Sequence, residues 1–485
     1  MTSLIKNELI KIFKKKSIYI TLLVVLAFVI LTNCIYKFFL NNTGSYSYYS
    51  EGYIEYLKEE IAKLDPSKPE DTKMYIEVKT NLDIYELMQK YENDSWQIKV
   101  IQENVGTYIN EKNTYLYGIE KDESKAQETQ NTIDEIVKKL DNDDWKYFAN
   151  LELTRANKNL EELQKSKENT VDKQELQEIE ISIENAKIDK EVANYRIEKQ
   201  IKYGNDYLNQ ALDQYEVYSK NLIGSKNYED MEYNEKQEYQ DSLKNKEINK
   251  YIIENNIDDN KVDLRGILKS FFSEYGLFII VIIVMIAGTI VSEEFNKGTV
   301  KLLLIKPYSR TKILLSKYLT TLIMIFFTIL ASVLMELVVG GIIFGLDSLS
   351  VPVLEYNFNT NQLETINILA YLGLQILTQL PMLILLATLA FALSTIFTNS
   401  ALAITISLLG YMSPNIINAL VIQYKVEFMK YFVTMNWDLK QYMFGALPNM
   451  EGMTMPFSII ISLIYLFIML IPTFIIFKKK NIKNI

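Results

Sequence analysis

The 485-residue chain contains no histidine, one cysteine, nine prolines and 17 glycines. Without histidine it lacks the usual zinc ligand and the commonest general base, so enzymes that depend on a histidine in either role are excluded. The one cysteine, Cys34, cannot form an intramolecular disulfide. Any part of the chain outside a membrane must therefore fold without covalent crosslinks.

Several signatures of chemistry are also missing. The chain has no Gly-x-x-x-x-Gly-Lys-Ser/Thr loop for nucleotide phosphates and no Gly-x-Ser-x-Gly nucleophile motif. The acidic run Asp-Asn-Asp-Asp at residues 141–144 lacks the glycine and the bidentate glutamate of a calcium loop. No basic stripe with interleaved aromatic residues indicates nucleic-acid binding. We expect a chain that is not an enzyme, with no catalytic, cofactor-binding or metal-binding residues and no nucleic-acid partner.

Long apolar runs, by contrast, are abundant. A helix needs about 20 apolar residues to cross a hydrocarbon core of about 30 Å. Six stretches meet or approach this length: residues 17–36, 271–291, 319–344, 366–397, 401–422 and 457–477. They predict an all-α membrane protein with six transmembrane helices in the lipid bilayer.

The distribution of charge predicts the orientation of these helices. Lysine and arginine gather before the first stretch, between the second and third, and after the sixth, whereas residues 346–365 contain three acids and no base. An even number of crossings places all three basic regions on one side, which the positive-inside rule makes cytoplasmic. We therefore expect a multi-pass protein of the bacterial cell membrane with both termini inside.

A large polar segment separates the first two stretches. Residues 41–270 hold 49 acidic and 32 basic residues, whereas the rest of the chain holds 11 acidic and 19 basic residues. This segment is predicted to be an acidic extracellular domain. It is poor in glycine and proline apart from a turn at residues 65–69. Its later apolar residues recur at helical steps, which predicts an antiparallel helical or coiled-coil stalk. A solvated spacer and a substrate-guiding or partner-binding module both remain possible roles.

The first apolar stretch also resembles a secretory signal. Asn33 is larger than the residues that cleavage sites use, and the apolar run continues to Leu40. We therefore expect residues 17–40 to be an uncleaved first transmembrane helix, preceded by an amphipathic cytoplasmic helix at residues 1–16.

A short basic segment, residues 292–317, follows the second stretch. Gly298 permits a sharp bend out of the membrane. Val300, Leu303 and Leu304 form the apolar face of a short helix, which Pro307 ends. A helix of this size suits either an interfacial anchor or a partner's groove.

This segment resembles the coupling region of the permease subunits of type-two ABC exporters, in which Glu-x-x-x-x-Gly-Thr precedes Leu-Leu, Pro-x-Ser-Arg and a lysine. The residues that carry the resemblance are Glu293, Gly298, Thr299, Leu302, Leu303, Pro307, Ser309, Arg310 and Lys317. Glu294 gives the tighter spacing Glu-x-x-x-Gly-Thr and is the preferred family acid. The start of the chain resembles the family's elbow helix, through Leu4, Ile5, Glu8, Leu9, Lys11 and Phe13.

The resemblance implies a membrane subunit that is energised by a separate cytoplasmic ABC ATPase, which binds the ATP and Mg²⁺. It implies a homodimer or a pair with a paralogous permease, and outward transport of a hydrophobic or amphipathic substrate such as a peptide, drug or lipid. Glu294, Thr299, Leu303 and Arg310 would contact or orient the ATPase. Residues 423–456 would form an extracellular re-entrant loop within the membrane domain of residues 271–485.

The large insert departs from the compact members of that family, so the substrate stays open. Three other functions remain: a signalling subunit that transmits force to its stalk without transport, a sodium-extrusion permease, and a structural or receptor-like membrane protein that uses no ATPase.

Three of the polar residues within the predicted spans are candidates for helix packing or for a pathway. Glu336 either snorkels to the outer interface or lines a pathway. Gln375 and Gln379 share one helix face, where they either bond to a neighbouring helix or contact substrate.

Overall fold

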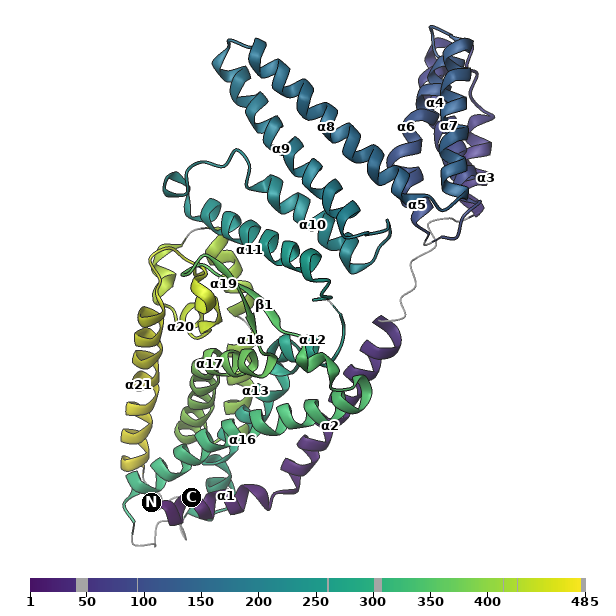
Figure 1. Cartoon of the computed structure of the whole chain (residues 1–485). Coiled ribbons are helices and arrows are strands. Elements are labelled where there is room, and N and C mark those ends of the chain that lie inside the picture. The colour runs from purple at the N-terminus through teal and green to yellow at the C-terminus, as the bar shows by residue number, and fades with distance from the viewer. Residues whose placement is uncertain are drawn as a thin grey trace. The chain divides into compact units, whose positions relative to one another are not determined.

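The chain forms two compact units in the computed structural model (Figure 1). The membrane unit comprises Met1–Asn42 and Asp259–Ile485, and the insert unit comprises Thr43–Asp258. The second boundary falls before the expected residue 271, because a short helix, α12 (Leu264–Lys269), packs against other helices of the membrane unit. The structure describes residues 1–40, 51–93, 95–259, 261–300, 308–412, 414–424 and 426–480.

The membrane unit contains six helical spans among the described residues that are long and apolar enough to cross a bilayer. They are α2 (Lys16–Ile35, continued by the π-helix η1, Tyr36–Leu40), α13 (Phe271–Thr289), α16 (Arg310–Phe344), α17 (Ile368–Phe397), α18 with α19 (Ser400–Met412 and Pro414–Gln423) and α21 (Met455–Lys479). A helix makes its backbone hydrogen bonds within itself, so it can cross lipid without leaving backbone N–H and C=O groups unpaired. The chain is an all-α membrane protein, as its sequence predicted.

The core of this unit surrounds α13. In the most apolar 18-residue stretch of α13, 61% of the residues are buried. The corresponding share is 11% for α21 and 20% for the α18–α19 span. Residues Ile279, Val284 and Ala287 of α13 are fully enclosed by α16, α17 and α18. Large apolar side chains of the outer helices, such as Ile342 and Phe467, are exposed. The unit is therefore apolar both in its core and on the surface of its outer helices, as contact with lipid requires.

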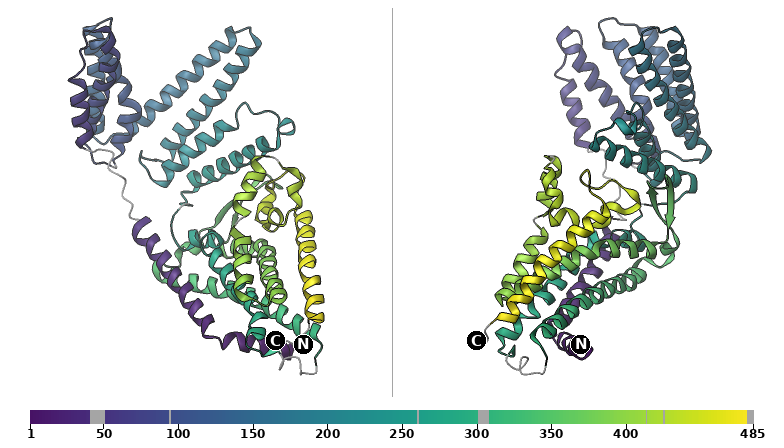
Figure 2. Two further views of the ribbon diagram at one scale, coloured as in Figure 1. Left: turned by 180° about the vertical axis from the view of Figure 1, so that it is seen from behind. Right: turned by 90° about the vertical axis from the view of Figure 1, so that its left-hand side faces the viewer.

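The helices of the membrane unit run between two ends (Figure 2). One end, called the basic end, carries α1 (Thr2–Phe13), α14 (Ser292–Asn296), the start of α16 and the close of α21. The opposite end carries α12, the 3-10 helix η4 (Asp347–Ser350) and a set of short helices: η5 (Glu427–Tyr431), α20 (Val433–Asn436) and η6 (Leu439–Gly445). The expected re-entrant loop at residues 423–456 therefore contains short helices.

A β-hairpin at this opposite end was not predicted. Strands β1 (Val353–Asn357) and β2 (Gln362–Ile366) pair antiparallel, with Val353 opposite Ile366. The signal was present in the sequence, because asparagines 357, 359 and 361 stand between two runs of strand-forming residues. Asn361 has a φ of +52°, which asparagine tolerates better than most residues.

The insert unit is built of helices throughout its described residues, apart from turns. They are α3 (Glu51–Ile61), α4 (Pro69–Met88), α5 (Trp96–Val100), η2 (Ile101–Val105), α6 (Gly106–Tyr117), α7 (Glu123–Asp141), α8 (Trp145–Asn169), α9 (Lys173–Glu198), α10 (Tyr207–Asn221), η3 (Tyr228–Asp230) and α11 (Tyr233–Asn255). The predicted turn at residues 65–69 separates α3 from α4. Helices α8 and α9 lie side by side as a long hairpin (Figure 1).

Aspartates begin four of these helices. Asp122, Asp144, Asp172 and Asp206 each accept a hydrogen bond from a backbone N–H of the first turn. Such caps satisfy amide groups that have no partner within the helix. The acidic run at residues 141–144 is likewise used within the fold, since Asp143 accepts from Trp96 Nε1 and binds Lys202.

Candidate functional site

A buried lysine joins three elements at the basic end of the membrane unit. Lys317, on α16, is 2% exposed. Its Nζ donates to Glu8 Oε2 of α1 at 2.7 Å, to the Ile290 carbonyl beyond α13 at 3.0 Å and to Glu294 Oε1 of α14 at 3.4 Å. All three protons of the ammonium group therefore have acceptors.

A second lysine and a threonine complete the group. Lys11 Nζ donates to Glu8 Oε1 at 3.0 Å and to Glu294 Oε1 at 2.7 Å, and the Thr299 hydroxyl donates to Glu294 Oε2. We call these five residues, Glu8, Lys11, Glu294, Thr299 and Lys317, the coupling cluster. Two carboxylates and two ammonium groups balance within it. A partly buried ion group of this kind is tolerated only when its charges are paired and hydrogen-bonded.

The electrostatics of the cluster favour the ionised form of Glu294. Burial raises the pKa of Glu294, but Lys317, Lys11 and the Thr299 hydroxyl together outweigh burial and lower this pKa to about 2. Glu294 is therefore charged at every physiological pH.

Glu293 points to a different set of partners. It binds Lys15 at 2.8 Å and Lys297 at 3.3 Å. Burial raises the pKa of Glu293, and the two lysines more than offset this, so the net shift is downward. Of these two glutamates, only Glu294 contacts Thr299.

The bend after α14 depends on Gly298. Its φ is +69°, a left-handed conformation, although a Cβ there would meet no atom within 4 Å. The backbone conformation, and not lack of space, accounts for glycine at this position. Val300 follows and is buried. Leu302, Leu303 and Pro307 lie outside the described residues.

The start of α16 is held on both sides. Ser309 caps the helix, with its Oγ accepting from the Lys312 amide at 3.3 Å. Arg310 Nη1 donates to the carbonyls of Lys478 and Lys480, at 3.1 and 2.8 Å. Arg310 thus satisfies carbonyls at the end of α21, an intramolecular role that the sequence did not reveal because the two partners are about 170 residues apart.

The elbow residues lie where the sequence places them, on one helix before the first span. Glu8 and Lys11 of α1 belong to the coupling cluster. The ring of Phe13 packs edge-on against the ring of Phe327 of α16, with 4.8 Å between the ring centroids. Lys15, with a ψ of 122°, breaks the helix between α1 and α2. Helix α1 is therefore fixed to α16 by charge and by packing.

The intramembrane polar residues lie nearer the opposite end. Glu336 is fully buried, so the snorkelling alternative is wrong. It accepts from Tyr275 OH at 2.6 Å and from Asn33 Nδ2 at 3.0 Å. The sequence singled out neither partner, although a polar residue inside an apolar run was the available signal for Asn33.

The two glutamines bond to neighbouring elements, as expected. Gln375 Nε2 donates to the Lys269 carbonyl at 2.6 Å, and Gln379 Nε2 donates to Asp438 Oδ1 at 2.9 Å. Both also line a polar cavity of about 350 Å³, together with Tyr411 of α18, Trp437 and residues of the short helices. This volume is within the range of small-molecule sites, about 300–1,000 Å³.

Comparisons with known proteins identify relatives without a stated activity. A family described as "Protein of unknown function (DUF2705)" matches residues 243–483. The chain is 35% identical over 209 residues to the "Uncharacterized protein YhcI" of Bacillus subtilis (strain 168), a match that covers 43% of this chain and 65% of the relative, less than two thirds of its length. It is 28% identical over 200 residues to the "Uncharacterized membrane protein YdbK" of the same organism, covering 41% of this chain and 76% of the relative. No solved structure matches the chain.

Both the helices and the second relative agree on the surroundings of this chain. The chain is embedded in a membrane, as its six long apolar helices and its similarity to a membrane protein indicate.

Proposed function

We propose that this chain is the permease subunit of an ATP-driven ABC exporter in a bacterial cell membrane, with the basic end of its membrane unit in the cytoplasm. A separate ATPase subunit binds ATP and Mg²⁺, and a second permease, identical or paralogous, completes the membrane part. The observation that carries the proposal is the coupling cluster, which ties the loop after α13 to α1 and α16.

The cluster suits a loop that receives force from a partner. Leaving a buried charge without its partner costs about 3–5 kcal/mol. Separation of the loop from α1 and α16 would leave such charges unpaired, so we expect the three segments to move together. A motor that binds the loop differently in its two nucleotide states would shift the balance between two arrangements of the spans. Tyr308, which directly precedes the Ser309 cap of α16, is exposed at the basic end.

The proposed substrate is hydrophobic or amphipathic, such as a peptide, drug or lipid. The cavity beside Gln375 and Gln379 supports this, since it offers polar groups to one part of a molecule while Phe272 and Met382 offer apolar surface to another.

Co-purification with an ATPase tests the class of protein. The tagged chain is expressed in its native host and purified in mild detergent, and ATP hydrolysis and co-purifying ATPase subunits are measured. Leu303→Asp should release the ATPase, because it places a charge on the apolar face that would enter the partner's groove. Val171→Asp is the matched control, because Val171 is 93% exposed in the insert unit. Retention of the ATPase by Leu303→Asp, or its absence from the wild-type preparation, would refute the proposal.

Transport assays separate export from force transmission. Inside-out vesicles that contain the complex should accumulate an amphipathic peptide or a lipid analogue when ATP is supplied. ATP hydrolysis without any accumulation would favour the signalling alternative, and sodium uptake alone would favour sodium extrusion.

A further inference from the structure

Two buried oxygen atoms in the membrane unit lack hydrogen-bond partners and point into the same small space. They are Glu336 Oε1 of α16 and Asn33 Oδ1 of α2. Both side chains belong to fully buried residues. An unpaired buried acceptor costs about 1–3 kcal/mol, and more when it is charged. Two such acceptors at one place require an explanation.

Gly340, one turn after Glu336 on α16, defines the space that they share. A Cβ at Gly340 would lie 2.6 Å from Glu336 Oε1, 3.2 Å from Asn33 Oδ1 and 2.6 Å from Leu264 Cδ1 of α12. The space is therefore too small for a methyl carbon.

The other atoms of the same two side chains are already paired. Glu336 Oε2 accepts from Asn33 Nδ2 at 3.0 Å and from Tyr275 OH at 2.6 Å. The amide of Asn33 and the carboxyl group of Glu336 thus face one another and share one hydrogen bond, from Nδ2 to Oε2. A second one between Oε1 and Oδ1 would need a hydrogen, because both of these oxygens are acceptors. A proton on Glu336 Oε1 would donate to Asn33 Oδ1 and complete a reciprocal acid–amide pair.

No opposite charge compensates a carboxylate at this position, among the residues that the structure describes. The charged or titratable groups that face it are Tyr275 and Glu274 of α13 and Tyr36 of η1, whose hydroxyl donates to Glu274 at 2.7 Å. On α12, Arg265 binds Asp259 and the Pro352 carbonyl. On η1, Lys37 donates to the Ile343 carbonyl of α16.

We propose that Glu336 is a proton-binding site and that its proton ties α2 to α16 through Asn33. A metal ion fits less well, because hard cations take about six or more oxygen ligands and only two free oxygens converge here. Without the proton, the negatively charged Glu336 Oε1 would face Asn33 Oδ1, and the two oxygens would repel each other. This repulsion would weaken the packing of α16 against α2. The site belongs to the membrane unit alone, so it does not depend on the docking of an ATPase.

Infrared spectroscopy tests the protonation state directly. The difference spectrum between the wild-type chain and Glu336→Gln in detergent at neutral pH should show the carbonyl band of a protonated carboxyl that is lost in the variant. A lost carboxylate band in its place would overturn the proposal. A protonated band that sodium ions shift at constant ionic strength would identify a cation site and would also overturn it.

Thermal stability provides the second readout. The folded chain is proposed to hold one proton more than the unfolded chain at neutral pH, so the wild-type Tm should fall as pH rises. In Glu336→Gln the amide donates permanently to Asn33 Oδ1, so the Tm should match the wild type at low pH and lose this part of the pH dependence. Glu336→Ala should be less stable at every pH. Parallel pH profiles for the wild type and Glu336→Gln would overturn the proposal.

Discussion

At the scale of single residues, Lys317 holds the coupling cluster together. It supplies a full positive charge to Glu8 and Glu294 from a position that is almost closed to water. Lys11 binds the same two carboxylates but is half-exposed, so solvent screens its contribution. The two lysines are therefore expected to differ greatly in importance.

Lys317→Met should lower the free energy of unfolding by about 3–5 kcal/mol, because it leaves two carboxylates with a single, exposed cation. Denaturant unfolding of the purified chain in detergent measures the loss. Lys312→Met, at an exposed position of the same helix, is the control and should change the free energy by less than about 0.5 kcal/mol. Adding Glu8→Gln to Lys317→Met should recover part of the loss, and strict additivity would contradict a direct pairing.

Glu294 makes the stability of the cluster depend on acid. Its pKa falls from 4.5 to about 2 in the folded chain. The folded state therefore binds fewer protons than the unfolded state between these values, and the stabilisation is complete above about pH 4.5 and lost as pH falls toward about 2. Unfolding of the wild type and of Glu294→Gln should thus differ most above pH 4.5 and converge in acid. A difference that is constant across this range would contradict the assignment.

The resemblance to the coupling region and elbow helix of exporter permeases named all five residues of the coupling cluster, although it did not predict their contacts. Glu8 and Lys317 bind each other across 309 residues of sequence. The roles of Arg310, Asn33 and Tyr275 could not be predicted, because each depends on a partner that only the packing of distant helices brings near.

At the scale of elements, the bend directly after α14 is set by the backbone conformation of Gly298. Gly298→Ala should destabilise the loop by about 1–2 kcal/mol, since an L-residue is strained at a φ of +69°. The measurement is again unfolding in detergent. Gly373→Ala, inside α17 where a Cβ also meets no atom within 4 Å, is the matched control and should be neutral or slightly stabilising.

Elements were predictable where one physical signal dominates. Apolar length alone predicted all six spans, and the Pro-rich break predicted the turn between α3 and α4. The β-hairpin was not predicted, because strands of five residues leave only a weak pattern of alternation in the sequence.

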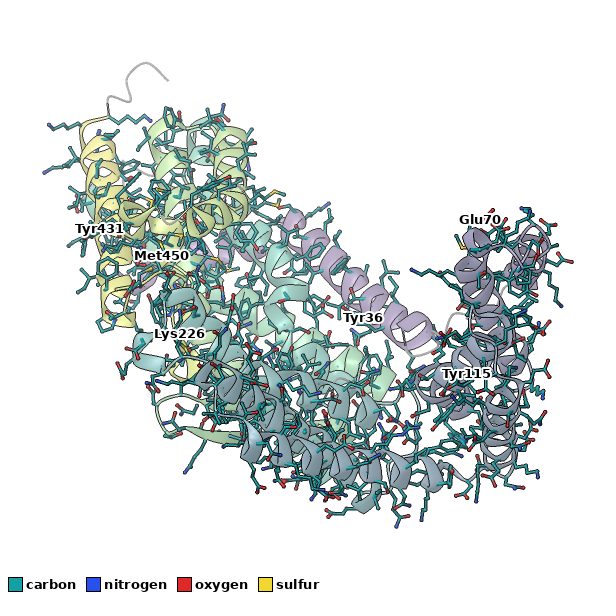
Figure 3. The ribbon with its side chains drawn as sticks, turned by 90° about the horizontal axis from the view of Figure 1, so that it is seen from above. Tyr36, Glu70, Tyr115, Lys226, Tyr431 and Met450 are labelled. Atoms are coloured by element: carbon teal, nitrogen blue, oxygen red, sulfur yellow. The ribbon has the colours of Figure 1, made fainter. Side chains whose placement is uncertain are left out.

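At the scale of the whole molecule, the two units have separate hydrophobic cores. One surrounds α13, and another surrounds Trp96, Val100 and Phe148 of the insert unit. Figure 3 shows the ribbon of the chain with its side chains as sticks. Units with separate cores can unfold independently. We therefore expect two thermal transitions.

Calorimetry of the full chain in detergent should resolve them. Trp96→Ala removes a side chain that is 5% exposed, and it should lower only the transition of the insert unit, by an amount that corresponds to about 3–5 kcal/mol. Lys317→Met should lower only the other transition. A common shift of both transitions by either variant would show one cooperative molecule instead of two units.

The hydrogen bonds from Arg310 to the Lys478 and Lys480 carbonyls have a practical consequence for attaching a tag or a surface to this protein. A fusion partner or a surface attachment placed directly behind residue 480 would pull on the first turn of α16, seven residues from Lys317. A label on the long α8–α9 hairpin would leave that turn unloaded.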